Sequence, residues 1–241
     1  MKNIGRHAPS KPLMPQLHIA NINSLHKSTI NWLHPDEEHV FLLKKRKISQ
    51  QQYLASRFLT KYLYIGENKA QWQEYKLAYS EHQQCVCLTK NAELINTFSL
   101  SHSGQWVALL ECRYGLGGVD IQIHNKTKHQ LLGLSGLLSD LDRPLLNNNL
   151  ARFYRLWSTK EAFAKLRGKS IFDVLATPHY AVWRQAYMRF LSYNNQWDLA
   201  VSLDKDLSIE VNFWEVAEDE QGYQVHRINT DTLPSTLSIL K

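Results

Sequence analysis

Hydrophobic residues recur at helical spacing in two long segments of the chain. In residues 49–64, apolar and aromatic positions return every three or four residues, which is typical of an amphipathic helix with Ser49 as its N-cap. Residues 150–167 contain good helix formers and neither Gly nor Pro. Asn residues at 147–149 offer this segment an N-cap, and Gly168 stands where a glycine commonly ends a helix. Each segment therefore predicts one long helix.

Shorter segments alternate or run apolar, and they predict β-strands between these helices. Pro35 followed by three acidic residues predicts the start of a further helix. Residues 1–20 contain three prolines and predict an extended arm, and residues 131–141 are apolar enough for a short helix. The predicted strands are residues 18–22, 76–79, 85–88, 97–100, 107–111, 117–123, 197–203 and 207–213.

Composition limits the class of protein without choosing a function. The chain has 241 residues, of which 44% are hydrophobic and 21% charged, so it has enough apolar residues for a core in one large domain or two small ones. The net charge of +6 favours an anionic partner, which leaves nucleic acid, an acidic protein or a phosphate-rich small molecule.

The chain also lacks the patterns of secreted and membrane proteins. Three cysteines do not indicate a disulfide framework. The first 25 residues hold no apolar stretch of signal-peptide length, and nowhere do about 18 apolar residues run together. We therefore expect a cytoplasmic protein that does not contact a membrane.

Two carboxylates stand where their elements could bring them together. In residues 119–123, Asp120 and Gln122 alternate with apolar residues and so share one face of the predicted strand. Glu161 and Lys165 lie four apart on the later helix, a spacing that by itself is typical of an ion pair on a solvated surface. An acid on a strand and an acid on a helix can also hold Mg²⁺, which needs one or two carboxylates when substrate phosphates supply further oxygens.

Three ordered blocks resemble a known family. Residues 118–122 read GVDIQ, residues 157–165 read WSTKEAFAK, and residues 98–106 read FSLSHSGQW. Together they are similar to the signature of 4′-phosphopantetheinyl transferases, specifically the surfactin-synthetase-activating (Sfp-like) type. The resemblance covers roughly residues 40 to 203.

The resemblance implies an α+β fold of two similar lobes related by a pseudo-twofold axis. Each lobe would be a small, mainly antiparallel sheet packed on a long helix, with coenzyme A between the lobes. Residues 1–117 would form the N-terminal lobe with a polar N-terminal arm, and residues 118–241 the C-terminal lobe with the metal and catalytic motifs. The protein would be a monomer.

The resemblance implies transfer of 4′-phosphopantetheine from coenzyme A to a serine of an acyl, peptidyl or polyketide carrier protein, with release of 3′,5′-ADP. Mg²⁺ would be the cofactor, held by Asp120, Gln122 and Glu161. Glu161 would also act as the base and Lys165 would balance charge on the phosphates. Many relatives have Glu at the place of Gln122, so we expect weaker metal affinity here.

Five further residues would bind the coenzyme. The resemblance assigns Arg57 and His102 to its 3′-phosphate, although Arg57 can also be an ordinary helix arginine and a lone histidine is often structural. The family's docking surface for the carrier would lie in residues 124–149, where Leu132, Leu134, Leu137 and Leu138 form either a patch or a core-facing helix. The coenzyme-binding set is Arg57, Lys90, Ser101, His102 and Lys160.

Two other functions remain open at this point. A non-catalytic relative would bind a carrier protein or a nucleotide without transfer, but the intact Asp120, Glu161 and Lys165 argue against it. A basic nucleic-acid-binding module would agree with the charge, but Lys and Arg are scattered and no recognition motif is present. We therefore expect no nucleic-acid partner.

Overall fold

A computed structural model gives the fold of most of the chain. It describes residues 14–24, 30–79, 86–91, 93–111, 116–125, 133–147, 149–193, 196–219, 222–228 and 238–240. Most of the expected N-terminal arm lies outside the described residues. The part that is described, from Gln16 onward, already belongs to a strand.

The larger sheet combines strands from both ends of the chain. Its order is β10-β9-β1-β5-β4-β3-β2, and its neighbours pair antiparallel except for β1 and β9, which run parallel. Its strands are β1 (Gln16–Ser24), β2 (Tyr75–Tyr79), β3 (Val86–Lys90), β4 (Glu93–Ser103), β5 (Trp106–Glu111), β9 (Glu210–Asp219) and β10 (Gly222–Ile228).

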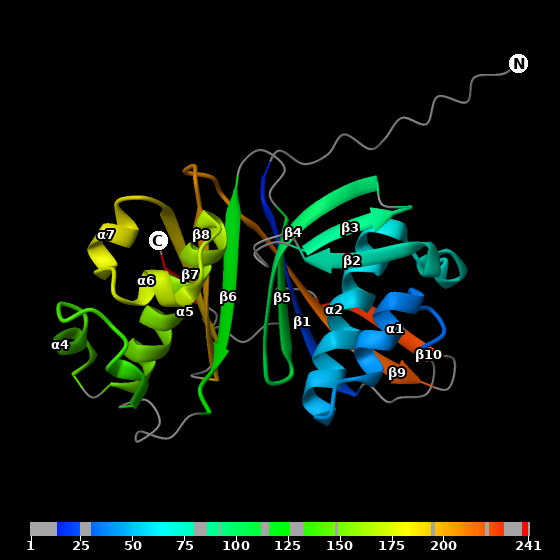
Figure 1. Ribbon diagram of the computed structural model, residues 1–241, viewed down its shortest axis with the longest axis horizontal. Helices are drawn as coiled ribbons and strands as arrows, with labels where there is room; N and C mark the ends of the chain where they lie inside the picture. The colour runs from blue at the N-terminus through cyan, green and yellow to red at the C-terminus, as the bar shows by residue number, and fades with distance from the viewer. Residues whose placement is uncertain are drawn as a thin grey trace, which may run out of the picture.

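The smaller sheet has the order β11-β7-β8-β6, and all its pairs are antiparallel. Strand β6 therefore lies at one edge of it, and Figure 1 shows β6 beside β4 and β5 of the larger sheet. The strands are β6 (Gly117–Ile123), β7 (Tyr187–Tyr193), β8 (Trp197–Leu203) and β11 (Ser238–Leu240).

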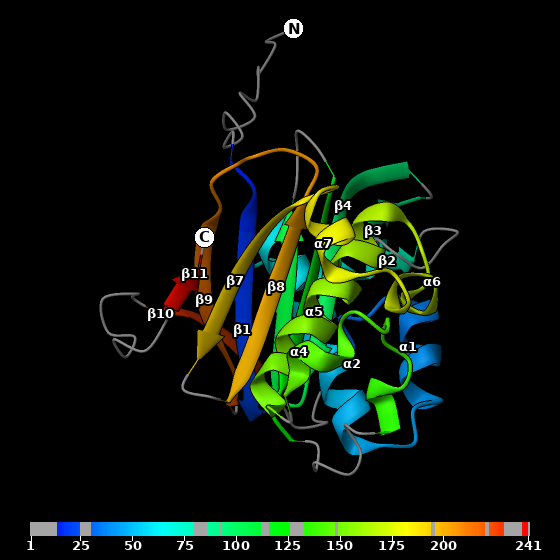
Figure 2. The same ribbon diagram turned by 90° about the vertical axis from the view of Figure 1, so that its left-hand side faces the viewer.

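Helices cover the outer face of each sheet, as Figures 1 and 2 show. The 19-residue α2 lies on the larger sheet and the 18-residue α5 lies on the smaller one. Shorter helices accompany each of them. The helices are α1 (Pro35–Leu42), α2 (Lys47–Ile65), the 3-10 helix η1 (Lys69–Glu74), α4 (Arg143–Leu146), α5 (Leu150–Arg167), α6 (Ile171–Leu175) and α7 (His179–Trp183).

The two sheets pack face to face through an apolar layer. Leu17 and Ile19 of β1 contact the same buried cluster as Val119 and Ile121 of β6, and Trp197 of β8 is fully enclosed there. Separate clusters join α2 to the larger sheet and α5 to the smaller one. The molecule is thus α+β, with two sheets between two layers of helices. The similarity of two lobes about a pseudo-twofold axis stays a prediction.

No single boundary in the sequence separates the strands of the larger sheet from those of the smaller one. Strand β6 begins at Gly117, next to the predicted boundary, and enters the smaller sheet. Strands β9 and β10 then return to the larger sheet, where Gln16 of β1 pairs with Glu210 of β9. The division into domains 1–117 and 118–241 therefore stays a prediction, and the sheets themselves interleave the two ranges.

Most predicted elements are present with shifted ends. Helix α5 spans the predicted residues 150–167, with Asn149 capping its start and Gly168 in the left-handed conformation at its end. Helix α2 begins before Ser49, at Lys47, so the prediction of Ser49 as its N-cap is wrong. Residues 207–209 are not in a strand, so the last predicted strand began too early.

No described helix is long and apolar enough to cross a membrane.

Candidate active site

Asp120 and Glu161 reach one site because α5 packs against β6 with almost no space between their backbones. Gly118 makes this approach possible, since a Cβ atom at that position would lie 2.0 Å from the carbonyl oxygen of Ala162. On β6, Val119 and Ile121 face the apolar layer between the sheets, which leaves Asp120 on the face covered by α5. The structure thus brings the strand that carries Asp120 against the helix that carries Glu161, as the sequence predicted.

The Lys165 ammonium group lies between the two carboxylates. Its Nζ atom is 3.1 Å from Oδ1 of Asp120 and 3.6 Å from Oε1 of Glu161, and it donates to the carbonyl oxygen of Val119 at 2.9 Å. The structure therefore brings Asp120, Glu161 and Lys165 together, with the Lys165 ammonium between the two acids. Glu161 and Lys165 are therefore not an isolated surface pair, because Lys165 also pairs with the buried Asp120.

Burial sets the protonation of this cluster. Asp120 is 0% exposed, and its removal from water is the main reason that its pKa rises to about 7. The negative charge of Glu161 also raises the pKa, whereas the positive charge of Lys165 lowers it. Burial alone would lower the pKa of Lys165, but the carboxylates of Asp120 and Glu161 raise it above its ordinary value. The site thus favours a cation between its two acids.

Neighbouring side chains hold the two carboxylates in place. The Gln122 amide donates from Nε2 to Oδ2 of Asp120 at 3.0 Å, and the Trp157 indole donates from Nε1 to Oε2 of Glu161 at 3.0 Å. Trp157 stacks in turn on Phe153 of the same helix, which fixes the indole ring. Sequence reasoning gave Trp157 no role, although its i,i+4 spacing to Glu161 is visible in the sequence.

The donors at this site agree with a hard divalent cation. Two carboxylates and the Gln122 amide supply oxygen atoms, and Lys165 shows that a positive charge is accommodated between the acids. Among the described residues, no group of three or more His, Cys, Asp or Glu side chains could hold a metal ion. A cation at this site would therefore need oxygens from a substrate or water in addition to the protein.

Three serines of β4 join it to the free edge of β6. The hydroxyls of Ser99, Ser101 and Ser103 accept hydrogen bonds from the backbone N–H groups of residues 119, 121 and 123, at 2.9, 3.3 and 3.0 Å. We call these residues the serine ladder. Ser101 also donates from Oγ to Oδ1 of Asp120 at 2.7 Å. The predicted coenzyme-binding residue Ser101 is thus in contact with the predicted metal ligand Asp120.

His102 is near the same site but does not touch Asp120. Its side chain is exposed to solvent, while much of its surroundings is protein. This partial burial lowers the pKa of His102, and the positive charges of Lys165, Arg57 and Lys44 lower it further. His102 therefore lies within electrostatic range of three cations, from α2, α5 and the segment before α2.

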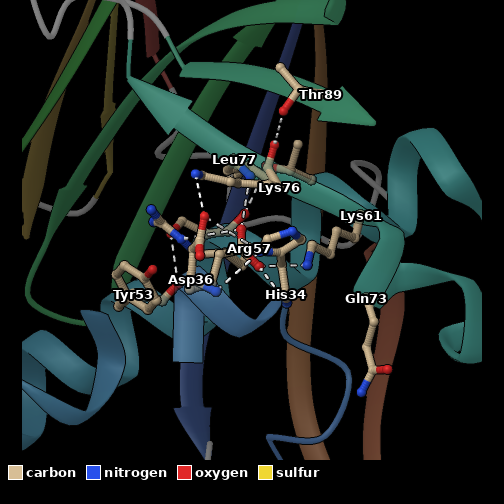
Figure 3. A network of polar contacts seen from close by, with 12 residues as sticks. His34, Asp36, Tyr53, Arg57, Lys61, Gln73, Lys76, Leu77 and Thr89 are labelled. Atoms are coloured by element: carbon tan, nitrogen blue, oxygen red, sulfur yellow. Dashed lines mark hydrogen bonds and ion pairs between the residues drawn. The ribbon is translucent and has the colours of Figure 1, made fainter. Parts of the chain in front are cut away.

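Arg57 is buried in a polar network of the larger sheet and its helices (Figure 3). Its guanidinium stacks on the ring of Tyr53 at 3.6 Å, and its Nη1 donates to the Ser56 hydroxyl at 2.9 Å. Its Nε lies 4.0 Å from the Glu37 carboxylate and has no hydrogen-bond partner among the described residues. Only 4% of the side chain is exposed, so Arg57 is neither a freely solvated nor a fully satisfied arginine.

Glu37 is the carboxylate that pairs with Arg57 and Lys61 in this network, and sequence reasoning missed it. It accepts from Lys61 Nζ at 2.6 Å and from the backbone N–H of Leu77 at 2.9 Å. Glu37 and Lys61 are almost completely buried, as is Arg57. One carboxylate between two buried cations leaves a surplus positive charge in this region.

Lys160 does not point into the site. It is 0% exposed, pairs with the buried Asp142 at 2.8 Å, and donates to the carbonyl oxygen of Leu175 at 2.7 Å. Because successive helix residues differ by about 100° in direction, Lys160 faces another side of α5 than Glu161 does. The structure gives Lys160 the role of an internal ion pair that holds the end of α6 against α5.

Lys90 lies at the far end of β4 from Ser101. Its neighbour across the sheet is Glu93, eight residues before Ser101, which corresponds to about 26 Å of strand at about 3.3 Å per residue. Its Nζ pairs with Glu74 at 2.5 Å on the surface. The structure does not bring Lys90 together with Asp120.

A hollow of about 540 Å³ lies between the start of α2 and the ends of β4 and β6, and neither Asp120, Glu161 nor Lys165 lines it. Such a volume is in the range of small-molecule sites. Gln52 of α2 fixes one wall by donating to the Gly104 carbonyl oxygen at 2.7 Å. The hollow is lined by Ile22, Ile48, Gln51, Gly104, Gln105, Trp106, Ile123, His124, Asn125 and Gln196.

Comparison with known proteins gives a partial match. The chain is 33% identical over 86 residues to two enzymes named 4′-phosphopantetheinyl transferase AcpT, from Salmonella typhi and Salmonella typhimurium. The aligned segment covers 33% of this chain and 44% of each relative, so the chain spans less than half the length of the relatives it matches. No protein-family model matches the chain. The similarity supports the phosphopantetheinyl transferase superfamily in general, at low identity and coverage.

Proposed function

We propose that the protein transfers the 4′-phosphopantetheine group of coenzyme A to a serine of an acyl, peptidyl or polyketide carrier protein. The observation that supports this most strongly is the convergence of Asp120 and Glu161 on one positive charge, the Lys165 ammonium. The partial similarity to two 4′-phosphopantetheinyl transferases agrees with it. That similarity supports the broad superfamily and not the Sfp-like type, so the subtype stays a prediction.

Mg²⁺ is the proposed cofactor, and Asp120, Glu161 and Gln122 are the residues that would hold it. When bound, the ion would neutralise charge on the pyrophosphate of coenzyme A and polarise its phosphorus atom. Gln122 now turns its amide nitrogen toward Asp120, which leaves its carbonyl oxygen free to ligate the ion or a water molecule.

The protein's own residues supply the remaining parts of the transfer. The serine oxygen forms a bond to phosphorus as the bond to the leaving phosphate oxygen breaks, which releases 3′,5′-ADP. Glu161 is partly exposed and is held by Trp157, so it can accept the proton of the attacking serine hydroxyl. Lys165, which lies between the acids, is placed to balance negative charge on the phosphates.

The basic groups near the site are proposed to hold the 3′-phosphate end of coenzyme A. Arg57 has an unpaired buried Nε and belongs to a network with a surplus positive charge. Arg57 and Lys44 both lie within electrostatic range of His102. The hollow beside Gly104 and Ile123 offers space for part of the coenzyme.

The docking surface for the carrier protein stays a prediction in residues 124–149. Leu138 is 2% exposed and packs with Phe153 and Tyr154, so for this residue the core-facing alternative is correct. Leu137 is 44% exposed and remains available to a partner. Leu132 lies outside the described residues. The monomeric state and the cytoplasmic location belong to the same proposal.

The test is to incubate the purified chain with coenzyme A, Mg²⁺ and a panel of apo carrier proteins, and to measure the intact mass of each carrier. We expect a gain of one phosphopantetheine on at least one carrier. Coenzyme A binding without any gain would support the non-catalytic relative instead. Retention of the chain on nucleic acid without any gain would support the basic binding module.

A further inference from the structure

Among the described strands, β6 is an edge strand whose outward N–H groups have no partner strand. An edge strand normally exposes such groups to water or to another chain. Here the serine ladder satisfies them, because alternate serines of β4 accept from alternate N–H groups of β6. The ladder therefore connects the larger sheet to the smaller one by side chains rather than by strand pairing.

Ser101 differs from the other two serines of the ladder. Its hydroxyl accepts from the Ile121 N–H at 3.3 Å and donates to Oδ1 of Asp120 at 2.7 Å. A serine hydroxyl has one proton to donate, so this donation leaves none for a phosphate oxygen. A donor to a buried carboxylate also makes a stronger hydrogen bond than a donor to a neutral group.

We propose that Ser101 is a positioning residue for Asp120 and not a ligand of coenzyme A. Its hydroxyl fixes the Asp120 carboxylate so that Oδ1 faces Lys165 and Oδ2 faces Gln122. Because Ser101 belongs to the larger sheet and Asp120 to the smaller one, this contact makes the cation site depend on how the two sheets are docked. The inference rests on the proposed function, in which Asp120 binds the metal.

Metal binding separates this role from coenzyme binding. The probe is Mn²⁺, whose free concentration is followed by electron paramagnetic resonance with the full-length chain in the absence of carrier protein. Residues that orient a metal ligand typically contribute about 10- to 100-fold to metal affinity, so we expect Ser101→Ala to weaken Mn²⁺ binding by that factor. Calorimetric binding of coenzyme A in EDTA should stay unchanged.

Two further variants make the test specific. Ser99→Ala removes the neighbouring rung of the ladder without touching Asp120, so Mn²⁺ binding should stay as in the wild type. Ser101→Thr keeps the hydroxyl donor on a β-branched residue suited to a strand, and should restore Mn²⁺ binding. If Ser101→Ala does not fold, Ser101→Cys, a weak donor of similar size, replaces it with the same expectation.

The opposite pattern would overturn the inference. That pattern is a Ser101→Ala chain that binds coenzyme A more weakly in EDTA while its Mn²⁺ affinity is unchanged. A wild-type chain that binds no Mn²⁺ would overturn it as well. If the variants follow the expected Mn²⁺ pattern but no carrier gains mass, the proposed function fails while the role of Ser101 stands.

Discussion

Asp120 is a carboxyl group enclosed by protein, and its protonation should decide when a cation can bind. Burial raises its pKa to about 7, so in the metal-free protein it carries a proton at lower pH. A metal ion must displace that proton, which makes the apparent affinity depend on pH.

We expect the apparent affinity for Mn²⁺ to fall as the pH drops below about 7, by up to about tenfold per pH unit, and to level off well above it. The sign follows because a raised pKa keeps the ligand protonated at a pH where a solvated aspartate is already charged. Titrations with Mn²⁺ across this range measure the effect. A flat profile across neutral pH would contradict burial as the cause.

Gln122 gives a second prediction at the scale of one residue. Gln122→Glu adds a negative charge next to Asp120 and removes the donor that now contacts Oδ2. The two carboxylates repel each other without metal and attract it more strongly, so the Mg²⁺ concentration for half-maximal transfer should fall. Gln122→Ala serves as the control and should need more Mg²⁺ than the wild type. A higher requirement in Gln122→Glu would remove Gln122 from the ligand set.

Residue spacing predicted some of these neighbours and not others. Glu161 and Lys165 share a helix face because they lie four apart, and Asp120 and Gln122 share a strand face because they lie two apart. Lys160 was assigned to the coenzyme through the resemblance, yet it is buried against Asp142. Its partners Asp142 and Leu175 lie outside α5, and periodicity within one helix cannot show them.

Helix α5 and strand β6 act together as the frame of the site. The small distance between them exists because Gly118 has no side chain, and it brings the Lys165 ammonium to the Asp120 carboxylate. A larger residue at position 118 should therefore separate the two acids as well as destabilise the fold.

Gly118→Ala tests this frame. Its Cβ would lie 2.0 Å from the Ala162 carbonyl oxygen and 2.7 Å from the Leu166 nitrogen, and backbone atoms cannot move aside as a flexible side chain can. We expect a loss of about 3 kcal/mol in the free energy of unfolding in urea, together with weaker Mn²⁺ binding. Gly133→Ala is the matched control, because no atom lies within 4 Å of the Cβ it would add. Equal stability of the two variants would contradict the close packing.

Element boundaries were predictable where local signals set them. Helix α5 has an Asn cap and a terminal glycine, and its ends agree with the prediction. Strand β9 begins at Glu210 rather than at Leu207 because its partner is β1, almost 200 residues earlier. Strand β10 lies in the polar end of the chain, where alternation alone gave no signal, and it forms by pairing with β9.

At the scale of the whole molecule, the apolar layer between the sheets should make them unfold together. Trp106 and Trp197 lie in that layer, whereas Trp32 and Trp72 lie between α2 and the larger sheet. Strands from both ends of the chain pair in the larger sheet, so neither residues 1–117 nor residues 118–241 form a complete sheet and core alone.

We therefore expect a single cooperative transition in urea. The tryptophan fluorescence of a chain that keeps only Trp197 and that of a chain that keeps only Trp72 should change at the same urea concentration as the far-ultraviolet circular dichroism. Midpoints that differ between the two tryptophans would contradict a shared core and would favour two independent lobes.

The resemblance predicted the overall plan of the site better than the sequence pattern alone did. Three blocks in order placed Asp120, Ser101 and Glu161 in one region, and the structure brings them together. It did not show that the serine ladder joins the sheets or that Glu37 pairs with both Arg57 and Lys61. Those contacts depend on how α1, α2 and both sheets pack, which is a property of the folded molecule.

Asp120 and Glu161 are proposed to hold together the cation that is used for transfer. The most direct measurement is the rate of mass gain of an apo carrier protein, with coenzyme A and Mg²⁺, for the wild type and for Asp120→Ala/Glu161→Ala. Loss of metal-assisted charge neutralisation is worth several kcal/mol, so the double variant should be slower by about a thousandfold or more. Transfer by the double variant at the wild-type rate would contradict the claim.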